Sequence, residues 1–139
     1  MDFVTDRTQA DVDARNAKGT YNTTDLNRVI SNCNTLVQLL NDAGYPVSIS
    51  WSRTTWTRTQ IPTTDQMQEF LDNVNAIKAA LPNNAPNAPA SMAYLTYQGA
   101  TDIEKILQEI DRLLTGLMTI YPRAGAAISG AVIYEVTST

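Results

Sequence analysis

One pattern of apolar positions occurs three times along the chain. Each copy places apolar residues at i, i+3, i+4, i+7, i+10, i+11 and i+14, which together form one broad face of a helix. The copies begin at Leu26, Met67 and Ile103, and Lys78 is the one polar residue that falls on the pattern. The repeat therefore predicts three amphipathic helices, at about 24–41, 65–81 and 101–120.

Residues that favour a helix start precede each copy at the same distance. Thr24, Asp65 and Thr101 stand two residues before the first apolar position, where a side-chain oxygen can accept hydrogen bonds from free backbone N–H groups. Asp65 with Gln68, and Thr101 with Glu104, have the spacing of a capping box. Residues that end helices follow the copies, namely Gly44, Pro82 and Pro122.

These elements predict a mainly α fold, a single helical-bundle domain over 1–139 with a short N-terminal helix between Thr8 and Gly19. Residues 47–53 alternate apolar and polar side chains, which predicts a half-buried strand. The β-prone stretch 127–136 could pair with that strand, or residues 122–139 could be a flexible strand that pairs with a partner chain. Residues 82–91, rich in proline and asparagine, are expected to form an extended, mobile linker between the second and third helices.

The third helix has more apolar surface than one neighbour would cover. Ile106, Leu113 and Ile120 form a second row beside the main stripe. A stripe of this width needs two neighbours, either both within the bundle or one from another copy of the chain. Ile133 and Tyr134, in the tail, are further candidates for such an oligomer contact.

Net charge and hydropathy exclude some partners. The formal net charge is −4 and the pI is about 4.6, whereas nucleic-acid binding proteins usually carry a basic surplus. No apolar run reaches the ~18 residues that span a bilayer. The first residues lack the basic and apolar regions of a secretory signal, so we expect synthesis in the cytoplasm. From the net charge we expect no nucleic-acid partner, and from the short apolar runs no membrane insertion.

The residue types needed for the commonest catalytic sites are missing. The chain has no histidine and one cysteine, Cys33, which excludes Ser-His-Asp and Cys-His sites and leaves a poor zinc ligand set. Asp102, Glu104, Glu109 and Asp111 are best explained as a solvated, ion-paired helix face. Glu104 and Asp111 would lie about 10 Å apart along the axis, too far for a usual glycosidase pair. We therefore expect no enzyme activity, no metal and no cofactor.

A segment without acidic residues, 44–64, holds two tryptophans and two arginines. Trp51, Arg53, Trp56 and Arg58 could contact a partner protein or a host surface glycan. The competing interpretation is that Trp51 packs into the bundle while the arginines balance acidic groups elsewhere. A carbohydrate-binding adhesin module that uses an exposed Trp/Arg patch is accordingly the alternative function.

Two asparagines occupy equivalent places in the first two helices. Asn32 and Asn73 lie beside the apolar stripe, where such residues more often bond a neighbouring loop than a ligand. Cys33 falls on the stripe and is expected to be a buried, unreactive small residue.

Taken together, four stretches resemble a family of small proteins encoded among the tail genes of phages and prophages of Firmicutes, gut clostridial ones included. The stretches are TDRTQADVD at 5–13, TDLNRV at 24–29, WTRTQIPT at 56–63 and LTYQGATDIEKIL at 95–107. The sequence departs from that family in its last ten residues. The resemblance implies a non-enzymatic structural protein of the virion, in the tail, baseplate or receptor-binding region. Its partners would be other copies of itself and neighbouring virion proteins.

Overall fold

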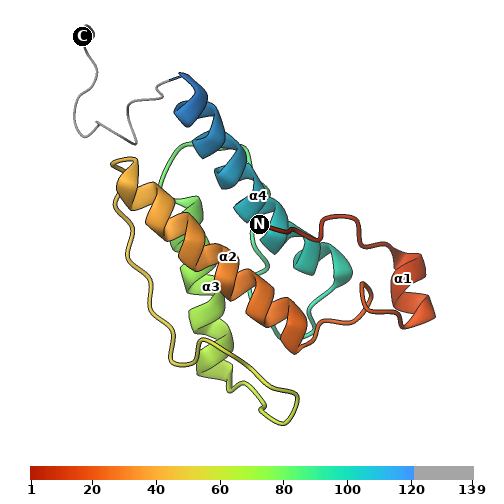
Figure 1. The fold of residues 1–139 in the computed structure, drawn as a ribbon. Coiled ribbons are helices and arrows are strands. Elements are labelled where there is room, and N and C mark those ends of the chain that lie inside the picture. Colours follow the sequence, from red (N-terminus) through yellow and green to blue (C-terminus); the bar gives the residue numbers. More distant parts are fainter. Residues whose placement is uncertain (121–139) are drawn as a thin grey trace, which may run out of the picture.

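The helical bundle predicted from the repeat is present. The computed structural model describes residues 1–120, with side chains through 117, and this range contains four helices. They are α1 (Gln9–Ala14), α2 (Thr23–Asp42), α3 (Thr64–Lys78) and α4 (Tyr97–Ile120). α2, α3 and α4 pack against one another, and α1 stands to one side of them (Figure 1). The chain is thus mainly α within the described residues.

The three apolar stripes meet in a single core. Every side chain of the repeated pattern is buried or half-buried, Lys78 included. The core residues with no exposed surface come from all three helices, and among them are Val29, Leu36, Leu40, Val74, Ile77, Ile103, Ile106 and Ile110. Burying one such side chain contributes about 1.5–3 kcal/mol, so the shared core is the main source of stability.

The helices begin earlier than the sequence pattern suggested. Asn22 caps α2 and Thr63 caps α3, each as part of a capping box with the third helical residue, Asp25 or Gln66. At the start of α4, the Thr96 hydroxyl accepts from the Gly99 N–H at 3.0 Å. The predicted caps Thr24, Asp65 and Thr101 were therefore wrong. The starts of α2 and α3 contain neighbouring residues of similar capping ability, and α4 offers Thr96 as well as Thr101, five residues later; local pattern alone does not choose between them.

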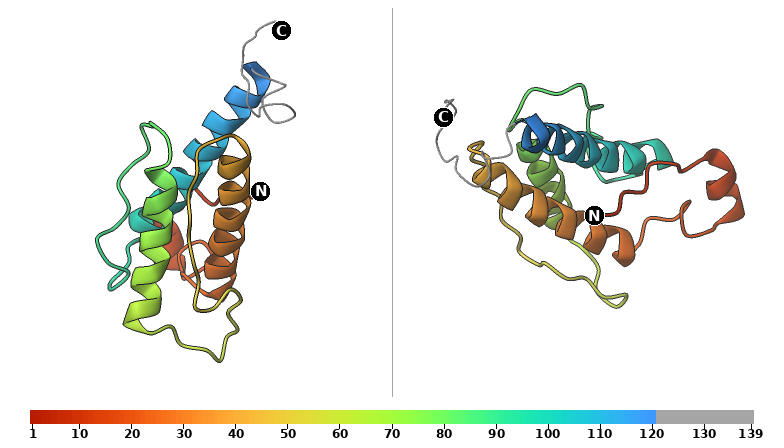
Figure 2. Two further views of the ribbon diagram at one scale, coloured as in Figure 1. Left: turned by 90° about the vertical axis from the view of Figure 1, so that its left-hand side faces the viewer. Right: turned by 45° about the horizontal axis from the view of Figure 1, so that its top comes forward.

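All three bundle helices run in the same direction (Figures 1 and 2). Parallel neighbours cannot be joined by tight turns, because the chain must travel back along the whole helix before the next one starts. A 20-residue helix such as α2 is about 30 Å long. The two connections, 43–63 and 79–96, therefore lie along the bundle as extended segments.

The predicted strand at 47–53 does not form. Val47, Ile49 and Trp51 are half-buried against the core, and the serines between them are exposed, so the alternation itself was interpreted correctly. The segment bonds helix side chains instead of another strand: the Val47 N–H donates to the Asn41 amide oxygen at 2.9 Å. Within residues 1–120 no strand is present, and the other half of the predicted β element, 127–136, lies outside the described residues.

The second connection contacts the bundle along its length. Asn83 donates to the carbonyls of Lys78 and Leu81 and closes the end of α3. Ala85, Ala88 and Leu95 are half-buried against the core. The segment 82–91 predicted as a linker does join the second and third bundle helices, and it contacts both, through Asn87 with Lys78 of α3 and the Asn84 backbone with Glu109 of α4.

Helix α1 belongs to a unit that folds on itself. Thr8 caps it as predicted, and Arg15 ends it in the left-handed conformation at φ 54°. Gly19 then lies against the helix backbone, where an added Cβ would stand 2.2 Å from the Asp11 carbonyl oxygen. No residue of α1 is buried, so this unit contributes little to the core.

Candidate functional site

Residues 1–7, here called the arm, lie in the groove between α2 and α4. The Asn32 amide of α2 donates to the Asp2 carbonyl at 2.7 Å. The Val4 N–H donates to the Glu104 carboxylate of α4 at 2.9 Å. Phe3 adds a half-buried ring to the core. The arm is thus held through its main chain by side chains from both helices.

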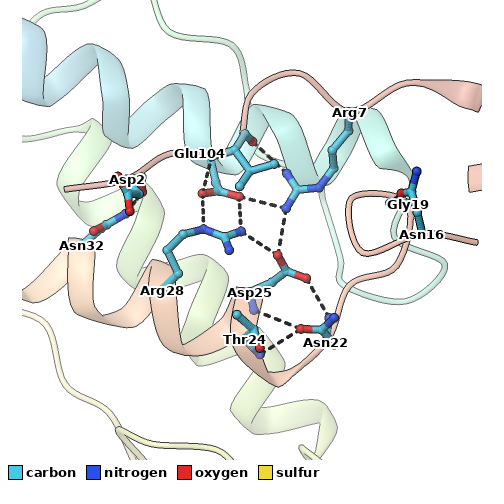
Figure 3. A network of polar contacts seen from close by, with 11 residues as sticks. Asp2, Arg7, Asn16, Gly19, Asn22, Thr24, Asp25, Arg28, Asn32 and Glu104 are labelled. Atoms are coloured by element: carbon cyan, nitrogen blue, oxygen red, sulfur yellow. Dashed lines mark hydrogen bonds and ion pairs between the residues drawn. The ribbon is translucent and has the colours of Figure 1, made fainter. Parts of the chain in front are cut away.

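At the end of the arm, four charged side chains meet inside the protein (Figure 3). We call Arg7, Asp25, Arg28 and Glu104 the arginine–carboxylate cluster. One Arg7 nitrogen donates to Asp25 at 3.1 Å and to Glu104 at 2.9 Å, while the other donates to the Val4 carbonyl at 2.9 Å. Arg28 binds Glu104 through two nitrogens, at 2.8 and 2.7 Å, and reaches Asp25 at 2.6 Å. Each guanidinium therefore bridges both carboxylates.

The cluster is shielded from water and balanced in charge. The side chains of Arg7 and Glu104 are 1% and 0% exposed, that of Asp25 is 7% and that of Arg28 17%. Two cations face two anions, which offsets the large cost of removing charges from water. The hydrogen bonds to Glu104, foremost, and to Asp25 raise the pKa of Arg28 above its ordinary value. All four side chains bond one another, and Glu104 and Arg7 also bond the main chain of Val4 in the arm.

An aromatic ring borders the cluster. The Arg7 guanidinium carbon lies 5.7 Å from the centre of the Tyr21 ring, a cation–π distance. Burial, followed by the nearby carboxylates, raises the pKa of the Tyr21 hydroxyl well above its ordinary value. Within the described residues, this hydroxyl, the Thr101 hydroxyl and the Arg7 Nε are buried without a hydrogen-bond partner. Unpaired polar atoms of this kind lower the stability of the fold.

Local sequence explains how two of these groups are aimed. Asp25 is the third residue of α2, and one of its oxygens accepts from the Asn22 N–H at 2.9 Å, which leaves the other for the arginines. Arg28 follows three residues later on the same helix face. Glu104 lies well inside α4, which starts at Tyr97.

The roles predicted for Glu104 were wrong, and no pattern in the sequence singled out Arg7, Asp25 or Arg28. Glu104 is neither a capping-box residue with Thr101 nor part of a solvated face, because α4 begins a turn earlier and the arm covers this position. The repeat did carry a signal. Glu104 follows the first stripe residue Ile103 just as Asn27 follows Leu26.

These equivalent flanking residues have equivalent partners. Asn27 of α2 bonds both the N–H and the carbonyl of Trp56 in the first connection, at 2.7 and 2.8 Å, as Glu104 of α4 bonds Val4 in the arm. In α3 the equivalent residue, Gln68, bonds Asp72 instead. Flanking polar residues of the stripe therefore hold the extended segments in two of the three grooves.

The predicted role of Asn32 and Asn73 is confirmed. Asn73 donates to the Ser50 carbonyl at 2.7 Å, and Asn32 donates to that of Asp2 at the same distance. Glu109, the equivalent residue of the third copy, accepts a hydrogen bond from the Asn84 backbone. Three matching positions thus bind the main chain of the segment that precedes their own helix.

The tryptophans and arginines of 44–64 do not form an exposed patch. Trp56 is 6% exposed, in the core, with the Arg53 guanidinium stacked 5.1 Å from its ring. Trp51 packs on Phe70 and donates its indole N–H to Asn34 at 2.9 Å. Arg53 and Arg58 are exposed. The packing of Trp51 into the bundle agrees with the competing interpretation, whereas within residues 1–117 neither Arg53 nor Arg58 forms an ion pair with an acidic group.

The residues considered for oligomer contacts differ in position. Ile106 is fully buried in the chain's own core, so it is not a surface contact and that prediction was wrong. Leu113 is half-buried at the edge of the core. Ile120 ends α4, but its side chain is not among those described, and Ile133 and Tyr134 lie outside the described residues.

The other acidic residues of α4 are half-buried, and of these Glu109 is ion-paired, so the predicted solvated, ion-paired face is only partly present. Glu109 pairs with Arg112 at 2.8 Å, and this pairing lowers the pKa of Glu109 and raises that of Arg112. Asp102 and Asp111 are half-buried.

In residues 1–120, no cluster of three or more metal-ligating side chains is formed. A shallow open groove of about 850 Å³ crosses this face of α4 between the arm and residues 84–86.

Chemically, the arginine–carboxylate cluster is suited to holding rather than reacting. Its carboxylates accept charged hydrogen bonds from two or more donors each, and its guanidiniums are permanently charged.

None of the helices in the described part of the chain has the length and apolar character needed to cross a membrane. Comparison with known protein families, curated proteins and solved structures found no match to this chain.

Proposed function

We propose that this chain is a structural component of a bacteriophage or prophage virion, in the tail, baseplate or receptor-binding region, acting through protein–protein assembly. The family assignment rests on the resemblance of residues 5–13, 24–29, 56–63 and 95–107 to phage tail-associated proteins. Its partners would be other copies of the chain and neighbouring virion proteins, and it would reside in the virion after assembly in the host cytoplasm.

The observation that carries the structural role is the use made of the buried charges. Arg7, Asp25, Arg28 and Glu104 bind one another and the arm, at 2.6–3.1 Å. Polar residues beside the apolar stripes likewise hold extended segments, as Asn27 and Asn73 do for the first connection. Such an arrangement favours one rigid arrangement of helices and arm, which is what repeated placement in a particle requires.

Particle composition tests the proposal. We would purify induced phage particles from a bacterium that carries the gene, on a density gradient, and quantify the chain by mass spectrometry relative to the tail proteins. The expected result is co-migration with intact particles at several copies each. Recovery of the chain only in the soluble fractions, with complete particles made by a strain lacking the gene, would refute a virion role.

Solution mass gives a second measurement on the chain alone. Sedimentation velocity of the full chain should show a multimer whose population rises with concentration. A matched comparison is Arg58→Ala, which changes an exposed arginine outside the cluster and should leave the distribution unchanged. A chain that stays monomeric at the highest concentration would contradict self-assembly and leave neighbouring virion proteins as the sole partners.

A further inference from the structure

The groove between α2 and α4 is built to bind an extended peptide. Its polar side chains address main-chain atoms: Asn32 bonds the Asp2 carbonyl and Glu104 bonds the Val4 N–H. Next to them, Glu104 and Asp25 form a buried acidic pair that receives Arg7. Main-chain bonds that give affinity, together with one charged pocket that gives specificity, are the ingredients of peptide recognition.

Most of the segment that joins the arm to α2 lies outside the core; the exception is Tyr21, just before α2, which packs against it. In α1 no residue is buried, and the helix and its following turn bond mainly to themselves, through Thr8 with Asp11 and Asn16 with Gly19. Figure 1 shows α1 projecting sideways from the bundle. A different course of residues 8–20 would therefore leave the three-helix core unchanged.

We propose that the groove between α2 and α4 is a docking site for the arm of a second copy of this chain, which replaces the chain's own arm by exchange. The contacts in the exchanged form are the same ones, including those of Arg7 with Asp25 and Glu104. Exchange of an identical element is a low-cost route to assembly, because no new interface has to be created.

Concentration decides between the two forms. The chain's own arm competes at an effective concentration on the order of millimolar, so exchange needs copies that are crowded together. This inference rests on the proposed function for that crowding, since copies in a particle stand side by side. The contact itself can be tested in solution with no particle present.

The test uses two variants of the full chain, each with one added thiol. Asp2→Cys places a thiol on the arm, and Ser31→Cys places one on α2 beside Asn32; both positions are exposed. The native Cys33 is fully buried, and the unmodified chain provides the blank. An equal mixture is treated with a short bis-maleimide, and mixed dimers are identified by mass. We expect about tenfold more mixed dimer at ~1 mM than at ~0.01 mM protein.

Two controls separate exchange from other contacts. Asn75→Cys, exposed on α3, replaces Ser31→Cys and should give no more mixed dimer than the blank. A chain that carries both Asp2→Cys and Ser31→Cys reports whether the arm closes on its own groove. Internal closure of that chain with no mixed dimer at any concentration would overturn the inference, as would equal yields from Ser31→Cys and Asn75→Cys.

The outcome also distinguishes this inference from the proposed function. A chain that sediments as a multimer, or that co-purifies with particles, without an arm-to-groove cross-link would keep the virion assignment and reject arm exchange. In a further control, a thiol-bearing peptide of unrelated sequence that contains an arginine replaces the Asp2→Cys chain. If it cross-links to Ser31→Cys with the same yield, arm exchange is also rejected, because the site would then not select this chain's arm.

Discussion

Asn32 and Asn73 hold the same place in two successive helices, and each donates at 2.7 Å to a backbone carbonyl in the segment that precedes its own helix. The repeat in the sequence is therefore a repeat of two things, an apolar stripe and the polar residues at its edge. The stripe forms the core, and the edge residues fix the course of the long returning segments. Parallel helices of this kind depend on both.

Removing one edge residue should loosen one segment and lower stability measurably. Asn73→Ala leaves the Ser50 carbonyl without its partner, and we expect the free energy of unfolding to fall by about 1 kcal/mol. Urea unfolding followed by circular dichroism provides the measurement. Asn75→Ala, an exposed change on the same helix, should stay within about 0.5 kcal/mol of the wild type. Equal losses for the two variants would contradict a specific role for Asn73.

Breaking the arginine–carboxylate cluster should cost more than any surface substitution. Arg7→Ala removes a cation whose side chain is 1% exposed and leaves Glu104 and Asp25 to share Arg28. We expect a loss of about 3–5 kcal/mol in the free energy of unfolding, because a buried carboxylate is left partly uncompensated. Arg7→Lys keeps the charge but not the planar guanidinium that reaches both Val4 and the carboxylates. Its free energy of unfolding should therefore lie between those of the wild type and Arg7→Ala.

Arg58→Ala is the matched control for this pair, since Arg58 is exposed and should change stability by less than about 0.5 kcal/mol. Amide hydrogen exchange adds a second readout. In Arg7→Lys the arm amide of Val4 should exchange faster while amides in the middle of α2 stay protected. An unchanged rate at Val4 would show that the arm is held without Arg7.

Periodicity was sufficient for the core because burial of an apolar stripe is a local property of the helix that carries it. All positions of the three copies of the pattern, which begin at Leu26, Met67 and Ile103, are buried or half-buried. Buried charge is different. Glu104 reads as a surface residue on its own helix, and only its approach to Arg7, 97 positions away in the sequence, makes it internal. Such pairing is set by the packing of distant segments, which no local pattern contains.

The strand predicted at 47–53 shows the same limit from the other side. Its alternation was correct, with Val47, Ile49 and Trp51 turned to the core. A strand, however, also requires a neighbouring strand to bond. Here helix side chains such as Asn41 and Asn73 take the place of that neighbour. The pattern predicted which side chains of 47–53 face the core, but not which groups its backbone would bond.

Deleting one buried hydroxyl should stabilise the protein or leave it unchanged. The Tyr21 hydroxyl is buried and unpaired among the described residues, while its ring lies under Arg7. Tyr21→Phe keeps the ring and removes the unpaired group, so we expect a gain of zero to about 1 kcal/mol in the free energy of unfolding. Tyr21→Leu, which removes the aromatic face as well, should destabilise. A clear loss in Tyr21→Phe would mean that the hydroxyl has a hydrogen-bond partner, such as a bound water.

The buried thiol of α2 gives a prediction about alkaline pH. Burial raises the pKa of Cys33 above its ordinary value of 9.0, so the folded chain keeps the thiol neutral while the unfolded chain ionises it. The stability linked to this group is fully present below pH 9 and falls as the pH rises above 9, by at most about 1.4 kcal/mol per pH unit. Cys33→Ala removes this contribution, so between pH 9 and 10 its free energy of unfolding should fall less steeply than that of the wild type. Tyr21, present in both chains, cancels in the comparison.

Thiol labelling gives a second measurement of the burial of Cys33. Labelling with a thiol reagent at pH 8 should be slow in the native chain and fast after unfolding in urea, whereas the added thiol of Ser31→Cys, exposed on the same helix, should label at once. Parallel pH profiles of the wild type and Cys33→Ala, together with rapid labelling of the native chain, would show that Cys33 is open to water and that the packing of α2 against its neighbours is looser than the core contacts require.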